Sequence, residues 1–160
     1  MLTRSFAIFA LAAAASALAV PAQAQNAAFV LSFGGEPGTP LAHAYDYGGS
    51  PEGVTSFALR VPIVDPTIKT VFVDSELVVD AATRMVKQVH IERAMGTVAL
   101  CTEAQAVVAK KLAELMPTPY TGTSPLWQYT AGGVVGGVSC RQERYLPFPI
   151  LILDLSLAPQ

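Results

Sequence analysis

The two segments that most constrain the fold lie at residues 70–79 and 86–94, where apolar and polar side chains alternate. The first segment carries Val71, Val73, Leu77 and Val79 on one face and Asp74 and Glu76 on the other. In the second segment, Val89 and Ile91 alternate with Gln88, His90 and Glu92. Alternation with period 2 is typical of a strand with one buried face. Because residues 80–84 suit a turn, the sequence predicts an antiparallel hairpin.

A capped amphipathic helix is predicted after the hairpin. Residues 102–105, Thr-Glu-Ala-Gln, fit the S/T-x-x-E/Q capping box, in which Thr102 accepts a hydrogen bond from the N–H of Gln105. Apolar residues then recur at helical spacing as far as Met116, and Pro117 ends the pattern. We therefore expect a helix over residues 103–116 that covers the apolar face of the hairpin.

Further strands are expected around this ββαβ core. They are predicted over residues 28–33, 54–64, 127–145 (one or two strands) and 147–159. Pro62 indicates an edge position for the second of them or a break in it, because proline cannot donate to a strand ladder. Residues 34–53 are rich in Gly and Pro and predict a long loop.

The predicted fold class is therefore α+β: a small, mainly antiparallel sheet packed on one amphipathic helix, with a ββαβ core and extra strands. The core is expected to contain Val71, Val73, Leu77, Val89, Ile91, Val107, Val108, Leu112 and Leu115.

The N-terminus has the pattern of a cleaved signal peptide. Arg4 precedes an uncharged, Ala-rich run, and an A-x-A pattern ends at Ala24. We expect residues 1–24 to be removed, which leaves a single domain at 25–160 in the periplasm or the medium. The run is shorter than a membrane-spanning helix needs, so no membrane insertion is expected after cleavage. No block of basic residues follows, which argues against a nucleic-acid partner.

Two cysteines, Cys101 and Cys140, are present in the chain. Export leads to a compartment where disulfides form, so we predict that these two residues are bonded to each other. The alternative is that Cys101 is a free thiol at a helix start, where the helix dipole would lower its pKa and a histidine could act as its base.

Residues 70–145 resemble the periplasmic C-terminal domain of the TonB family. The segment VVDAATRMVKQVHIERAMG is similar to that family's strand, turn, strand and small-residue exit, and the amphipathic helix follows. The resemblance implies a ββαβ unit and a binding role through an exposed strand edge. The chain departs from the family in its cysteine pair and in lacking a retained membrane helix and a Pro-rich spacer. No functional residue carries over.

The polar face of the hairpin is one candidate site. His90 is expected to share this face with Asp74, Glu76 and Glu92. A carboxylate opposite the imidazole would raise the pKa of His90 and could form a proton-transfer pair. The competing interpretation is an ordinary solvent-facing strand surface with favourable cross-strand pairs.

The Gly/Pro-rich loop is the other candidate site. It contains His43, Tyr45, Asp46 and Tyr47, and exposed tyrosines suit recognition because they supply contact area at modest entropic cost. His43 and Asp46 lack a nearby third ligand, so no metal is expected there. The chain also lacks the serine-nucleophile, phosphate-loop and dinucleotide motifs, so no catalytic residue and no cofactor is assigned.

The first functional hypothesis is an exported, non-enzymatic binding protein with a protein or peptide partner. One alternative is a small hydrolase or thiol enzyme that uses Cys101 or the His90/Asp74 face. Another is a protein that binds a small apolar ligand between the helix and the sheet.

Overall fold

The computed structural model describes residues 27–42, 53–119 and 129–158. The predicted signal segment and loop residues His43, Tyr45, Asp46 and Tyr47 lie outside them. The helices are α1 (Ala27–Phe33), the 3-10 helix η2 (Ile68–Thr70) and α2 (Val98–Leu115). The strands are β1 (Ser56–Pro62), β2 (Asp74–Asp80), β3 (Val86–Ala94), β4 (Thr118–Pro119), β5 (Tyr129–Ala131), β6 (Val134–Arg141) and β7 (Ile150–Leu157). The predicted α+β class is confirmed.

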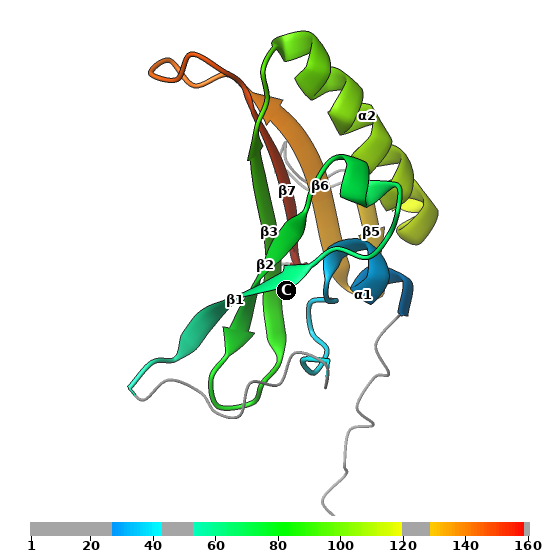
Figure 1. The fold of residues 1–160 in the computed structure, drawn as a ribbon. Coiled ribbons are helices and arrows are strands. Elements are labelled where there is room, and N and C mark those ends of the chain that lie inside the picture. The colour runs from blue at the N-terminus through cyan, green and yellow to red at the C-terminus, as the bar shows by residue number, and fades with distance from the viewer. Residues whose placement is uncertain (1–26, 43–52, 120–128, 159–160) are drawn as a thin grey trace, which may run out of the picture.

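All seven strands form one sheet in the order β1-β2-β3-β7-β6-β5-β4, and every pairing is antiparallel. The last strand, β7, is central because it pairs with both β3 and β6. Helix α2 lies across the same side of the sheet as α1 (Figure 1). The side chains on the other side of β2, β3 and β7 are only partly buried and mostly polar. We refer to this side as the open face.

Strand β1 forms one edge of the sheet, as Pro62 predicted. Ile63 N donates to Val73 O, and Ala81 N donates to Thr55 O, so odd-numbered residues of this segment direct their backbone groups toward β2. Even-numbered residues therefore direct theirs outward. The missing N–H of Pro62 lies on that outward side, where the ladder loses no bond.

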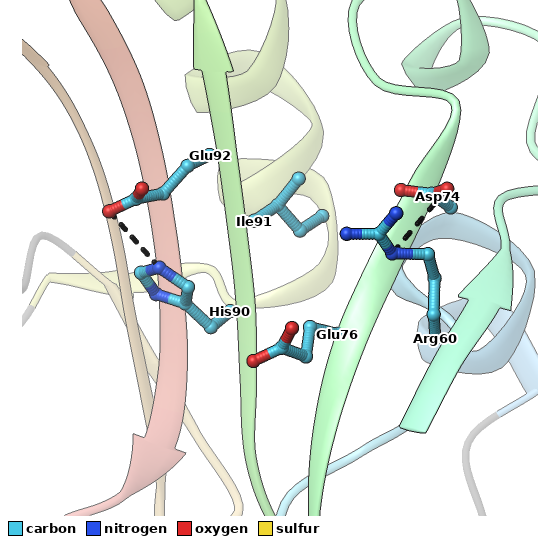
Figure 2. A pocket seen from close by; sticks show the side chains of 6 residues that line it. All are labelled: Arg60, Asp74, Glu76, His90, Ile91 and Glu92. Carbon is cyan, nitrogen blue, oxygen red and sulfur yellow. Dashed lines mark ion pairs between the residues drawn. The ribbon is translucent and has the colours of Figure 1, made fainter. Parts of the chain in front are cut away.

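The β2–β3 hairpin is confirmed, except that residues 70–73 of the predicted first strand precede β2, and Thr70 belongs to η2. The turn of the hairpin is held by Asp80. Oδ1 of Asp80 accepts hydrogen bonds from the backbone N–H groups of Ala82 and Thr83. At the opposite end the strands separate: the last pair is Glu76 with His90, although β2 begins at Asp74 and β3 runs to Ala94. Figure 2 shows the two ribbons diverging above this pair.

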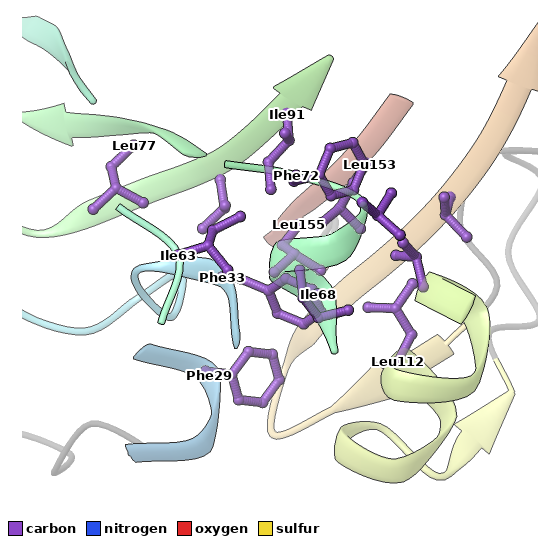
Figure 3. Close-up of a cluster of buried hydrophobic side chains, with 14 of the residues drawn as sticks. Phe29, Phe33, Ile63, Ile68, Phe72, Leu77, Ile91, Leu112, Leu153 and Leu155 are labelled. Carbon is purple, nitrogen blue, oxygen red and sulfur yellow. The ribbon is translucent and has the colours of Figure 1, made fainter. Parts of the chain in front are cut away.

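The core lies between the sheet and the helices (Figure 3). Its fully buried side chains include Phe29, Phe33, Ile68, Phe72, Leu77, Val89, Val108, Leu112, Leu151, Leu153 and Leu155. Most predicted core positions are buried or, like Val107 and Leu115, packed against the cluster. The prediction that Val73 belongs to the core was wrong, because this residue is 70% exposed. Val73 precedes β2 at the point where β2 and β3 diverge, so strand alternation no longer decides which way it points.

Residues 28–33 were predicted as a strand but lie within helix α1. A short apolar run carries no periodicity that separates a strand from a buried helical turn. The helix buries Phe29 and Phe33, which are four residues apart on one face and whose ring centroids lie 6.3 Å apart. Gly34 ends it with φ +83° and donates its N–H to Val30 O.

Helix α2 begins at Val98, five residues before the predicted start. Oγ1 of Thr97 accepts a hydrogen bond from Leu100 N at 3.2 Å, so Thr97 is the N-cap. The predicted cap, Thr102, lies inside the helix and donates to Val98 O. Gln105 contacts Val138 O on the sheet instead of closing a capping box.

The predicted disulfide is present. Cys101 and Cys140 are bonded, with 5.9 Å between their Cα atoms, and the bond joins the first turn of α2 to the end of β6. Near the start of β6, a Cβ on Gly136 would lie 2.3 Å from Cε of Met116. The glycine therefore lets the C-terminal end of α2 approach the sheet closely.

Among the described residues, no helix is both long enough and apolar enough to cross a bilayer.

Candidate functional site

Four strands place charged side chains side by side on the open face. The antiparallel registers pair Arg60 of β1 with Glu76 of β2, Glu76 with His90 of β3, and His90 with Asp154 of β7. Directly paired residues point to the same side of a sheet. The register therefore produces a row of alternating charge across the open face, centred on Glu76 and His90.

His90 is held between two carboxylates. Its Nδ1 lies 2.6 Å from Oδ1 of Asp154, and its Nε2 lies 3.2 Å from Oε1 of Glu92. Gln88 donates from Nε2 to the same Asp154 oxygen at 3.0 Å, which fixes the carboxylate. The Asp154 side chain is 14% exposed, so its contact with the imidazole is largely shielded from water.

The surroundings raise the pKa of His90 above its ordinary value of 6.5. Burial alone lowers this pKa, but the hydrogen bond and charge of Asp154, with the charge of Glu92, outweigh burial. The imidazolium form donates from both ring nitrogens, which matches a carboxylate on each side. A general base needs one ring nitrogen free to accept a proton, so this arrangement favours a structural or binding role for His90.

A prediction about pH follows from this arrangement. Because the folded pKa of His90 is raised, its contribution to stability is present below about 6.5 and is lost as pH rises through the folded pKa. Asp154→Asn should lower the pKa of His90, and the free energy of unfolding should then decrease less as the pH rises. Titration of the His90 ring signals by NMR measures the first effect, and urea unfolding across this pH range measures the second. If the pKa of His90 is unchanged in Asp154→Asn, Asp154 is not the cause of the raised pKa.

A cleft opens where β2 and β3 diverge. It encloses about 310 Å³ and is lined by Arg60, Asp74, Glu76, His90, Ile91 and Glu92 (Figure 2). Ile91 is buried and supplies an apolar surface between the charged side chains. A second hollow of about 230 Å³ shares three of these residues and extends the cleft to Phe72, Val73 and Arg93.

The 310 Å³ cleft is lined by three carboxylates and by two basic side chains, Arg60 and His90, and Arg93 lines the adjoining hollow. Asp74 is 3.8 Å from Nε of Arg60, a long ion pair between exposed groups that contributes little. Glu92 faces His90, whereas the side chain of Glu76 makes no hydrogen bond or ion pair with any described residue. In Figure 2, Glu76 lies between His90 and Arg60. The cleft thus has one carboxylate without a hydrogen bond or ion pair to a described residue, near the side chain of Ile91, an arrangement that suits the ammonium and methylene groups of a lysine side chain.

The sequence-predicted polar face is thus assembled, with one changed pairing. His90, Glu76 and Glu92 lie together, but Asp74 contacts Arg60 and not His90. The histidine's main partner is Asp154, which the sequence prediction missed. Alternation within 150–157 does place Asp154 opposite to the buried leucines, but no local signal indicates that β7 pairs with β3.

The other candidate residues of the sequence analysis are either disulfide-bonded or outside the described residues. Cys101 is disulfide-bonded and so offers no thiolate to act as a nucleophile. No group of three His, Cys, Asp or Glu side chains in the described segments could hold a metal ion. The tyrosine loop was the preferred binding site, and its four residues fall in the undescribed stretch 43–52.

Comparison with protein-family models, curated proteins and solved structures finds no significant match. The TonB-family resemblance of residues 70–145 therefore remains a prediction.

Proposed function

We propose that this chain is an exported, non-enzymatic binding protein whose cleft on the open face receives a lysine or arginine side chain of a protein or peptide partner. The observation that carries the proposal is the carboxylate of Glu76, which lines the cleft and has no hydrogen bond or ion pair with the residues that the structure describes. Glu92 and Asp74 lie on either side of it, and Ile91 provides the apolar surface between them.

The binding role is favoured over catalysis by the state of His90. Both of its ring nitrogens already face carboxylates, so it has no position from which to take a proton from a substrate. The hydrolase alternative on the His90/Asp74 face would also need these two residues together, and they have different partners. The apolar-ligand alternative needs space between α2 and the sheet, and at the C-terminal end of α2 Met116 lies close to Gly136 of the sheet instead.

Export is supported by two features of the chain. The N-terminal segment has the order of a signal peptide, and the Cys101–Cys140 bond is typical of oxidising compartments outside the cytoplasm. Cleavage after Ala24 and the choice between periplasm and medium belong to the proposal. The intact mass of the exported protein tests the cleavage site.

Glu76→Gln should weaken binding of a cationic side chain. Trilysine is a suitable probe, because its ammonium groups test the cleft without assuming a partner. We expect amide shifts at residues 76, 90 and 92 on titration with trilysine, and about three- to tenfold weaker binding in Glu76→Gln, as for the loss of one partly exposed ion pair. Raised salt should weaken the binding of trilysine to both the wild-type protein and Glu76→Gln.

Glu103→Gln is the matched control, because it removes the same charge from an exposed position on α2, across the sheet from the cleft. It should change trilysine binding much less than Glu76→Gln. Equal weakening in the two variants would mean that trilysine responds to net charge alone, and the proposed role of the cleft would then be wrong.

A further inference from the structure

The edge strand β1 offers a second surface, distinct from the carboxylates of the cleft. Its outward backbone groups are those of Ser56, Ala58 and Arg60, together with the carbonyl of Pro62. No described segment pairs with this side of β1. Three N–H donors and four carbonyl acceptors are therefore arranged to pair with one more antiparallel strand.

The side chains of β1 restrict what that strand can be. Its only charged residue is Arg60, whose side chain is 73% exposed and whose contact with Asp74 is long. On the opposite face, Phe57 and Leu59 are half-buried and pack against the core. The guanidinium of Arg84 lies 5.3 Å from the centre of the Phe57 ring, so a cation lies near β1 on this face as well.

Apolar surface continues past the end of β1. Val64 N donates to Leu31 O, and both side chains are at least half exposed. A strand laid along β1 in the antiparallel direction would begin beside this pair and end near Phe57. It would bury apolar side chains against one face and place a residue opposite Arg60 on the other.

We propose that β1 binds an extended segment of a partner protein with the pattern apolar–acidic–apolar–small–apolar. In antiparallel register, its five residues lie opposite Val61, Arg60, Leu59, Ala58 and Phe57 in turn. The acidic residue faces Arg60, where opposite charges attract across a pair of strands. The second and fourth residues direct their backbone groups to β1, and the other three direct theirs to solvent. This surface goes beyond the proposed cation binding in the cleft and does not depend on it.

The probe is a synthetic peptide centred on Val-Glu-Val-Ser-Val, titrated into the exported protein and followed by NMR. The amides of Ser56, Ala58 and Arg60 should shift more than those of Phe57 and Leu59, whose N–H groups already bond to β2. Methylating the backbone nitrogen of the peptide serine should abolish the shifts, because that N–H faces Ala58. Methylating the nitrogen of the central valine should preserve them, because that N–H faces solvent.

A charge exchange tests the side-chain part of the inference. The peptide with glutamate should bind about threefold tighter than the same peptide with lysine, and Arg60→Glu should reverse this preference. Circular dichroism checks that the variant is folded. The inference is overturned if neither peptide shifts the three amides at millimolar concentration, if both methylated peptides behave alike, or if Arg60→Glu keeps the preference for glutamate. None of these results depends on whether trilysine binds the cleft.

Discussion

Reduction of the Cys101–Cys140 bond is expected to lower the free energy of unfolding by about 2 to 5 kcal/mol. The bond closes a loop across a sequence separation of 39 residues, for which loop-closure entropy alone corresponds to roughly 4 kcal/mol. Such a loss is a large share of the 5 to 15 kcal/mol by which a typical domain is stable. Urea unfolding of the oxidised and reduced protein, compared at one pH, measures the difference.

The double variant Cys101→Ala/Cys140→Ala separates the cross-link from packing. Cys101 is fully buried, so alanine removes its sulfur contacts as well as the bond. If the cross-link dominates, the reduced wild-type protein and the double variant should lose similar stability. If reduction leaves the urea midpoint unchanged, the bond contributes nothing to the fold and its role must be sought elsewhere.

Gly34→Ala is expected to destabilise the fold by about 2 to 4 kcal/mol, through backbone strain and overpacking together. Gly34 has φ +83°, and a Cβ there would lie 2.3 Å from Cγ2 of Val61 and 2.6 Å from Oγ of Ser75. Ser75 cannot simply turn away, because its hydroxyl donates to Phe33 O inside the core. Thermal or urea unfolding of the variant measures the loss.

Gly133→Ala is the matched control for this variant. Gly133 has φ +82°, but nothing lies within 4 Å of an added Cβ. It should therefore show only the strain of a left-handed backbone, about 1 kcal/mol. Equal losses in the two variants would mean that the close approach of Gly34 to Val61 is not what requires glycine.

Local sequence patterns correctly predicted the elements whose structure depends mainly on their own residues. The β2–β3 hairpin follows from alternation, and the edge position indicated by Pro62 follows from proline chemistry. The errors arose where tertiary contacts or an unrecognised cap determine the type or the start of an element. Residues 28–33 form a helix because Phe29 and Phe33 pack together into the core, and α2 begins early because Thr97 caps it without a partner at the capping-box position.

The candidate site was only partly predictable for the same reason. Alternation placed His90 and Glu76 on one polar face, which the register confirms. The pairing of His90 with Asp154 depends on β7 returning to the centre of the sheet, 64 residues away in sequence. The cleft depends on the separation of β2 from β3 beyond the Glu76–His90 pair, and no residue pattern in either strand indicates this separation.

The most direct test of the central claim is to find which surface contacts a partner in the cells that make the protein. A photo-reactive amino acid placed at Val73, at the mouth of the cleft, is compared with the same group at Glu103 on α2. We expect a cross-linked protein at position 73, joined near a lysine or arginine of the partner, and none at position 103. A cross-link at position 103 with none at position 73 would contradict it, because the partner would then bind the helix side and not the open face.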